Sequence, residues 1–246
     1  MTLQEVLSAA LVEARDTKMD SKDQQTCKYC GKGFRKLSTL SAHLCERKRR
    51  YQQQNETGVQ LGFQTYLKFY EMNQGSAQSK TYDHFVKSDY YSAFVKFGQY
   101  LVSIRAVNAA VFIGWIVKSQ KKLDYWTKDA IYSEWLFDYL RKEHSNDALD
   151  RSFSEMQRWA DEEQRPFNLF FKEVSANKIC QMITNGRISP WVIYNSVGGV
   201  EFLSTLNEEQ IAMIYKFIDP PFWERKFIDY VADTEFIKMV TSTAAV

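Results

Sequence analysis

Residues 26–50 read TCKYCGKGFRKLSTLSAHLCERKRR, and this stretch decides how the N-terminal part of the 246-residue chain folds. Cys27 and Cys30 have the Cys-x-x-Cys spacing of a zinc knuckle, and His43 follows after twelve intervening residues. A segment of about 25 residues buries too little apolar surface to fold alone, so a metal that crosslinks a turn to a helix must supply folding free energy. The spacing therefore predicts a zinc-binding domain at residues 25–50.

This segment resembles a zinc finger of the C2H2 family. Phe34 and Leu40 occupy the two small-core positions of that family, and Gly31–Lys32 matches its knuckle turn. The resemblance implies a small ββα fold.

The fourth metal ligand departs from the family pattern, because Cys45 follows His43 after a single residue. A continuous helix would turn Cys45 about 200° away from His43, so the helix must end or tighten near Leu44 if both side chains reach one ion. We predict a zinc ion bound by Cys27, Cys30, His43 and Cys45. The alternative is a degenerate finger in which Cys45 is not a ligand.

Positive charge is concentrated in the same part of the chain. From Lys22 to Arg50 there are nine basic and two acidic residues, a net charge of +7, which leaves −5 on the other 217 residues. This asymmetry predicts a DNA contact confined to one region. One finger reads only about three base pairs, so contact with phosphate is favoured over sequence reading. The residues expected to make it are Arg35, Lys36, Arg47, Lys48, Arg49 and Arg50. A solvated charge run, or a finger that binds protein, is the alternative.

The remainder of the chain has the apolar spacing of helices, and glycine and proline together number only 14. We predict an all-α, two-part helical body behind the finger. The expected parts are an N-terminal amphipathic helix at 1–20, the finger at 25–50, a helical half at 58–144 and a helical C-terminal half at 145–246 that serves protein contacts. The polar stretches 20–26 and 51–57 are expected to be linkers. The cap-rich sequence HSND at 144–147 separates the two helical halves.

A second basic stretch runs from Lys96 to Lys128, with six basic residues against one acidic residue. Its end, KSQKKLDYWTK at 118–128, interleaves lysine with Tyr125 and Trp126, a pattern that suits DNA contact. The predicted contacts are Lys118, Lys121, Lys122 and Lys128. An ordinary lysine-rich loop between two helices is the alternative.

Several function classes are disfavoured by the sequence. The longest uncharged run, Ile188 to Val200, has 13 residues, fewer than the roughly 20 that a membrane helix needs. The N-terminus lacks the basic start of a secretory signal, and four cysteines do not make a disulfide framework, so we expect a soluble, cytoplasmic protein. No phosphate-binding loop, dinucleotide fingerprint or nucleophile elbow is present, and we predict that the protein is not an enzyme.

From residue 58 onward, the order of elements resembles the helicase-loading protein of T-even-type tailed bacteriophages. The similarity rests on TYDHF at 81–85, an aromatic-rich helix at 90–104, and KICQMITNGRISPWVIYNSV at 178–197. It implies an HMG-box-like first half that binds forked DNA, contacts with the replicative helicase and the single-strand-binding protein, and a place in the host cell cytoplasm. The family lacks a zinc finger, so residues 1–57 are an addition. A zinc-finger transcription regulator and a protein-interaction adaptor remain open alternatives.

Overall fold

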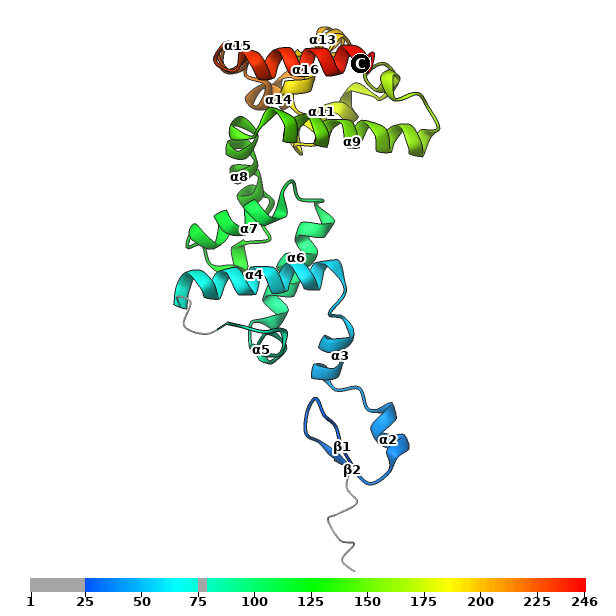
Figure 1. Ribbon diagram of the computed structural model, residues 1–246, viewed down its shortest axis with the longest axis vertical. Helices are drawn as coiled ribbons and strands as arrows, with labels where there is room; N and C mark the ends of the chain where they lie inside the picture. Colours follow the sequence, from blue (N-terminus) through cyan, green and yellow to red (C-terminus); the bar gives the residue numbers. More distant parts are fainter. Residues whose placement is uncertain (1–24, 75–78) are drawn as a thin grey trace, which may run out of the picture. The chain divides into compact units, whose positions relative to one another are not determined.

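The computed structural model describes residues 25–74 and 79–246, and in this part the chain is mostly helical with a two-stranded hairpin near its start (Figure 1). The predicted all-α body and the ββ element of the finger are confirmed at this level. The amphipathic helix predicted at residues 1–20 lies outside the described residues.

The chain divides into two compact units at Gln99–Tyr100, within α6. The elements that begin in unit 1 are β1 (Gln25–Thr26), β2 (Gly33–Phe34), α2 (Leu37–Ala42), α3 (Glu46–Gln52), α4 (Thr57–Gln74), α5 (Tyr82–Lys87) and α6 (Tyr91–Ser103). The strands are antiparallel, with Gln25 opposite Phe34 and Thr26 opposite Gly33.

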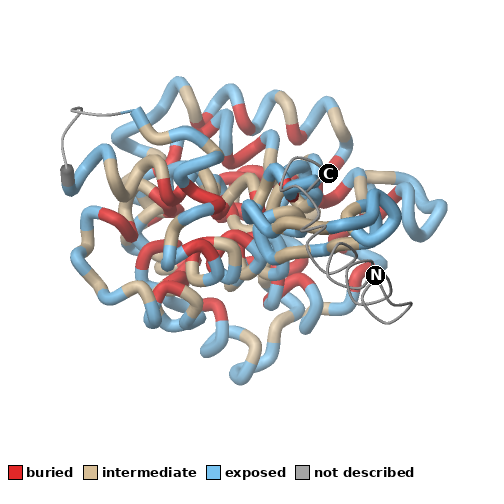
Figure 2. The backbone as a smooth tube through the Cα atoms, turned by 90° about the horizontal axis from the view of Figure 1, so that it is seen from below, coloured by how far each residue is buried: buried red, intermediate tan, exposed pale blue. Residues whose placement is uncertain are grey.

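Unit 2 holds helices throughout its length. Its elements are α7 (Ala109–Lys118), η3 (Leu123–Tyr125), α8 (Asp129–Lys142), α9 (Ser145–Glu163), η4 (Phe167–Leu169), α10 (Phe170–Glu173), α11 (Ala176–Thr184), α12 (Pro190–Tyr194), α13 (Val197–Ser204), α14 (Glu208–Ile218), α15 (Pro220–Asp229) and α16 (Val231–Thr243). Buried and exposed positions alternate along the helices of both units, as expected of amphipathic segments (Figure 2).

The core of unit 1 is built from aromatic side chains. The ring of Phe85 lies 4.6 Å from that of Tyr91 and 5.1 Å from that of Tyr66, measured between centroids. The backbones of α4 and α6 approach so closely that a Cβ on Gly98 would lie 2.0 Å from the carbonyl oxygen of Gly58. Glycine at position 98 therefore permits the helix crossing on which this core depends.

The prediction that residues 51–57 form a linker is wrong. Tyr51 and Gln52 complete α3, and α4 begins at Thr57, so only a short turn separates two helices. The sequence YQQQ lacks the apolar spacing of an amphipathic helix. Helix α3 is nevertheless stabilised by hydrogen bonds with side chains of α5. The Tyr51 hydroxyl donates to the Asp83 carboxylate, and the Tyr82 hydroxyl donates to the Arg50 carbonyl at 2.8 Å.

The helix boundaries in unit 2 follow the capping signals of the sequence. Asn108 accepts from the backbone N–H of Val111 at the start of α7, and Ser189 precedes Pro190 at the first position of α12. Gly186, which follows α11, has a φ of 69°, a left-handed conformation that favours glycine. At these three positions, residues that favour helix ends in the sequence lie at helix ends in the structure.

The turn between α8 and α9 carries a buried polar network. The Glu143 carboxylate accepts two N–H bonds from Arg151, at 2.6 and 2.7 Å, and a hydroxyl bond from Ser189 at 3.2 Å. These contacts join α8, α9 and α12 inside one compact unit, although the sequence predicted two halves that meet here. That functional division at 144–145 stays a prediction. Among the described residues, no helix combines the length and apolar composition needed to cross a bilayer.

Candidate metal centre

The four predicted ligands come together at one point of the N-terminal segment. Cys27 and Cys30 lie in the turn that joins the two strands, where the Gly31 N–H donates to the Cys27 carbonyl at 2.8 Å and Gly31 has a φ of 74°. The ligand atoms of Cys27, Cys30, His43 and Cys45 all lie within 4.8 Å of one another. The Cys45 thiol belongs to the cluster, as the sequence predicted.

The short His-x-Cys spacing works because the chain is extended there. Helix α2 ends at Ala42 and α3 begins at Glu46, and both His43 and Cys45 have extended backbone conformations. Side chains two residues apart on an extended chain point to the same side, whereas on a helix they diverge. The predicted end of the helix near Leu44 is therefore confirmed, and it explains how both side chains reach one ion.

The donor set fits zinc. The Sγ atoms of Cys27 and Cys45 are 3.9 Å apart, and Cys30 Sγ is 3.3 Å from His43 Nε2. A tetrahedral zinc site with Zn–S bonds of about 2.3 Å separates its sulfurs by roughly 3.8 Å. Three thiolates and one imidazole are a closed ligand set without a position for water, so the site suits a structural ion rather than a catalytic one.

The pKa values of the Cys27 and Cys30 thiols depend on the neighbouring backbone and on the other thiols of the cluster. A hydrogen bond from the Cys30 backbone N–H lowers the pKa of the Cys27 thiol. The backbone N–H of Lys32 acts in the same direction on Cys30, but partial desolvation and the neighbouring thiols raise the pKa of Cys30 above its usual value. Clustered thiolates repel, and a bound cation removes that repulsion.

The apolar core of this domain is small, so a bound metal would be its principal support. Cys27 is buried, but no residue of α2 is, and Phe34 and Leu40 are only half-buried. The Phe34 ring lies 4.7 Å from the His43 ring, between centroids, so the small core packs directly against a ligand.

The basic residues of the finger fall into two groups. Arg35, Lys36 and Arg47 are exposed and form no ion pair with a described residue. Arg49 is exposed and pairs with Glu46 at 2.6 Å. These side chains remain accessible to an anionic partner.

The side chains of Lys48 and Arg50 donate hydrogen bonds to backbone carbonyls of the protein. Lys48 donates to the carbonyls of Ser41 and His43, at 3.4 and 3.1 Å, and so covers the C-terminal end of α2. The Arg50 guanidinium donates to the Val86 carbonyl at 2.7 Å and lies 4.3 Å from the centroid of the Tyr91 ring. The sequence run RKRR does not show this difference, because the partners of Arg50 lie 36 and 41 positions away.

The second basic stretch is also divided by the structure. Lys118 and Lys122 are exposed, and Lys128 lies 4.1 Å over the exposed Tyr125 ring. Lys121 pairs with Glu134 at 3.3 Å. Trp126 is 2% exposed and its indole N–H donates to the Lys121 carbonyl, so this ring is part of the core and does not offer a face for stacking.

Comparisons of this chain with protein-family models, curated proteins and solved structures found no match.

Proposed function

We propose that this protein is a non-enzymatic DNA-binding protein whose zinc finger contacts the phosphate backbone. The observation that carries the proposal is the finger's set of exposed cations, Arg35, Lys36 and Arg47, which have no carboxylate partner among the described residues. Arg47 donates to the Tyr29 carbonyl at 3.4 Å, but none of the three cations is neutralised by a described carboxylate, so their charge is available to neutralise phosphates and release counterions. The ligand cluster fixes the backbone that carries these side chains.

The proposed role in the cell is helicase loading at a replication fork. It rests on the resemblance of residues 58–246 to the phage helicase loaders, with an HMG-box-like half that contacts duplex through Lys118, Lys122 and Lys128. The two exposed lysines and the Lys128–Tyr125 pair support that contact, since cations beside an accessible ring suit nucleic acid.

Replacement of Arg35, Lys36 and Arg47 by alanine is expected to weaken DNA binding on all sequences alike. Each phosphate contact contributes about 0.9 to the slope of log K against log salt, so loss of three contacts reduces the slope by about 2.7. Fluorescence anisotropy with labelled duplexes of different sequence, over a range of salt, measures both quantities.

The matched control replaces three exposed lysines of unit 2, Lys172, Lys178 and Lys238, and should leave the slope unchanged. A sequence-selective loss in the finger variant, with an unaltered slope, would contradict phosphate binding and favour the transcription regulator.

Helicase loading predicts that the full-length protein prefers forked over linear duplex DNA and stimulates the cognate helicase on DNA coated with single-strand-binding protein. Replacement of Lys118 and Lys122 by alanine should reduce the fork preference, while the Lys172 and Lys178 pair again serves as control. Absence of stimulation, together with absence of binding to both proteins, would reject the loader.

A protein-interaction role is the second candidate, and a specific feature favours it. Ile228, Val231 and Met239, at α15 and α16, are 73%, 59% and 58% exposed. Large apolar side chains left exposed on two successive helices favour a protein contact. An adaptor is preferred if no DNA binding is found at low salt.

A further inference from the structure

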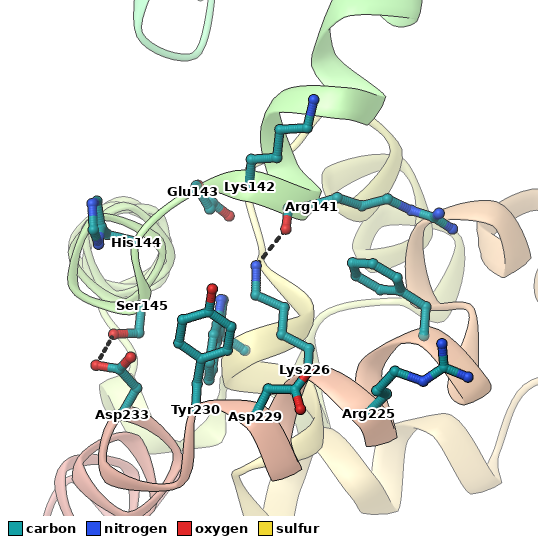
Figure 3. Close-up of a pocket in the computed structure, with 12 residues that line it drawn as sticks. Arg141, Lys142, Glu143, His144, Ser145, Arg225, Lys226, Asp229, Tyr230 and Asp233 are labelled. Atoms are coloured by element: carbon teal, nitrogen blue, oxygen red, sulfur yellow. Dashed lines mark hydrogen bonds between the residues drawn. The ribbon is translucent and has the colours of Figure 1, made fainter.

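Unit 2 contains a pocket of about 460 Å³ beside the turn that joins α8 to α9. Figure 3 shows its walls: the segment from Arg141 to Ser145 on one side, and the residues from Arg225 to Asp233 on the other. Trp191 of α12 and Phe222 of α15 complete the lining. The volume falls within the range of about 300–1,000 Å³ typical of sites for small molecules.

The acceptors of this pocket are largely occupied. The Glu143 carboxylate already accepts three hydrogen bonds, from Arg151 and Ser189. The Asp233 carboxylate accepts from the Ser145 hydroxyl at 3.0 Å, at one edge of the pocket (Figure 3). The carboxylate of Asp229 is exposed and accepts no hydrogen bond from a described residue.

Several hydrogen-bond donors that line the pocket, in contrast, have no acceptor among the described residues. Arg225 and Lys142 are exposed and make no ion pair or side-chain hydrogen bond with a described residue. The indole N–H of Trp191, a residue only 1% exposed, has no hydrogen-bond partner among the described residues, and neither has Nε of Arg141. A donor without a partner in the interior is uncommon, and the group that satisfies it must be an acceptor.

Charge and shape agree with this surplus of donors. Lys226 is half-buried and extends toward the Arg141 carbonyl, to which it donates, so its ammonium lies inside the pocket (Figure 3). Burial lowers the pKa of Lys226, a sign that its ammonium lacks full hydration, and an anion would restore that stabilisation. The rings of Trp191, Phe222 and Tyr230 supply apolar walls.

We propose that this pocket binds a small organic anion with a carboxylate or phosphate group on a flat apolar body. Lys226 and Arg225 neutralise the anionic group, the Trp191 indole N–H gains an acceptor, and the aromatic walls hold the body. The site is separate from the residues proposed to contact DNA and is independent of that function.

The test uses the full-length protein and the indole N–H resonances of its tryptophans, with the Trp191 signal assigned from Trp191→Phe. Phenyl phosphate and benzoate are the probes, and benzyl alcohol is their neutral counterpart. Saturable displacement of the Trp191 resonance by either anion, but not by benzyl alcohol, is the expected result, and the anion that binds more tightly identifies the preferred group.

Two exposed residues of α15 give variants with opposite expected effects. Arg225→Gln should weaken binding about tenfold, the effect of losing one charge-assisted hydrogen bond. Asp229→Asn, which removes a repelling charge, should tighten binding about threefold, while Lys178→Gln on α11 should change nothing. Intact resonances of the other indoles report that each variant is folded. The proposal is overturned if neither anion displaces the Trp191 signal, or if Arg225→Gln and Lys178→Gln have equal effects.

Discussion

Removal of zinc is expected to unfold residues 25–50 and to release one ion per chain, while the helices of unit 2 stay folded. Within the finger, Cys27 is buried, Phe34 and Leu40 are half-buried, and Leu37 and Leu44 are exposed, so we expect the metal to supply most of its folding free energy. Unit 2 contains none of the four clustered ligands and has an extensive apolar core. Chelation followed by amide hydrogen exchange would reveal loss of protection in the finger and retained protection in the helices of unit 2.

The variant Cys45→Ser tests the unusual fourth ligand. Loss of a residue that only hydrogen-bonds to a metal ligand typically weakens metal binding about 10–100-fold, and loss of a ligand itself should weaken it by more than about a hundredfold. Cys180→Ala is the matched control, because Cys180 is buried in α11 outside the cluster. Elemental analysis should give one zinc per chain for the wild type and the control. Equally tight binding by Cys45→Ser would remove Cys45 from the site.

The second large effect is expected from Arg151→Met in unit 2. The side chain of Glu143 is 0% exposed, and Arg151 is its charged partner, at 2.6 Å. Removal of one partner leaves an uncompensated buried charge, which should lower the free energy of unfolding of unit 2 by about 3–5 kcal/mol. The double variant Arg151→Met with Glu143→Gln should recover part of this loss, because it removes the stranded carboxylate.

Urea unfolding followed by tryptophan fluorescence measures this effect. The matched control is Arg165→Met, whose partner Glu173 belongs to an ion pair in which the arginine side chain is 53% exposed. Exposed pairs contribute about 0–1 kcal/mol, so the control should be nearly neutral. Equal effects of the two substitutions would show that Glu143 does not depend on Arg151.

The sequence predicts well the features that depend on neighbouring residues. Asn108, the Ser189–Pro190 pair and Gly186 mark helix ends by local backbone chemistry, and the structure agrees with each of them. The four metal ligands were also predictable, because zinc requires particular side chains at short spacing. In each case, the signal and the structure it specifies lie within about twenty residues.

Features that depend on distant partners were not predictable. Arg50 looks like its basic neighbours in the sequence, yet it is bound to Val86 and Tyr91. Tyr51 and Gln52 look like a linker and are helical because α3 docks on α5. The pocket between Arg141 and Asp233 has no signature in the sequence, since it depends on how α8, α12, α15 and α16 pack.

The two ends of α3 connect the metal cluster to α5, and this connection bears on how the protein should respond to free zinc. Its first turn begins at the metal ligand Cys45, and its last residues carry the contacts of Arg50 and Tyr51 with α5. Hydrogen bonding to Asp83 raises the pKa of Tyr51 to about 12, so this contact persists across the physiological pH range. We therefore expect metal binding and the docking of α3 on α5 to be thermodynamically linked, so that free zinc above the dissociation constant stabilises the docked state. Loss of zinc is therefore expected to expose the surface of α5 that carries Tyr82 and Val86, and the exposure of this helix should report on the supply of metal.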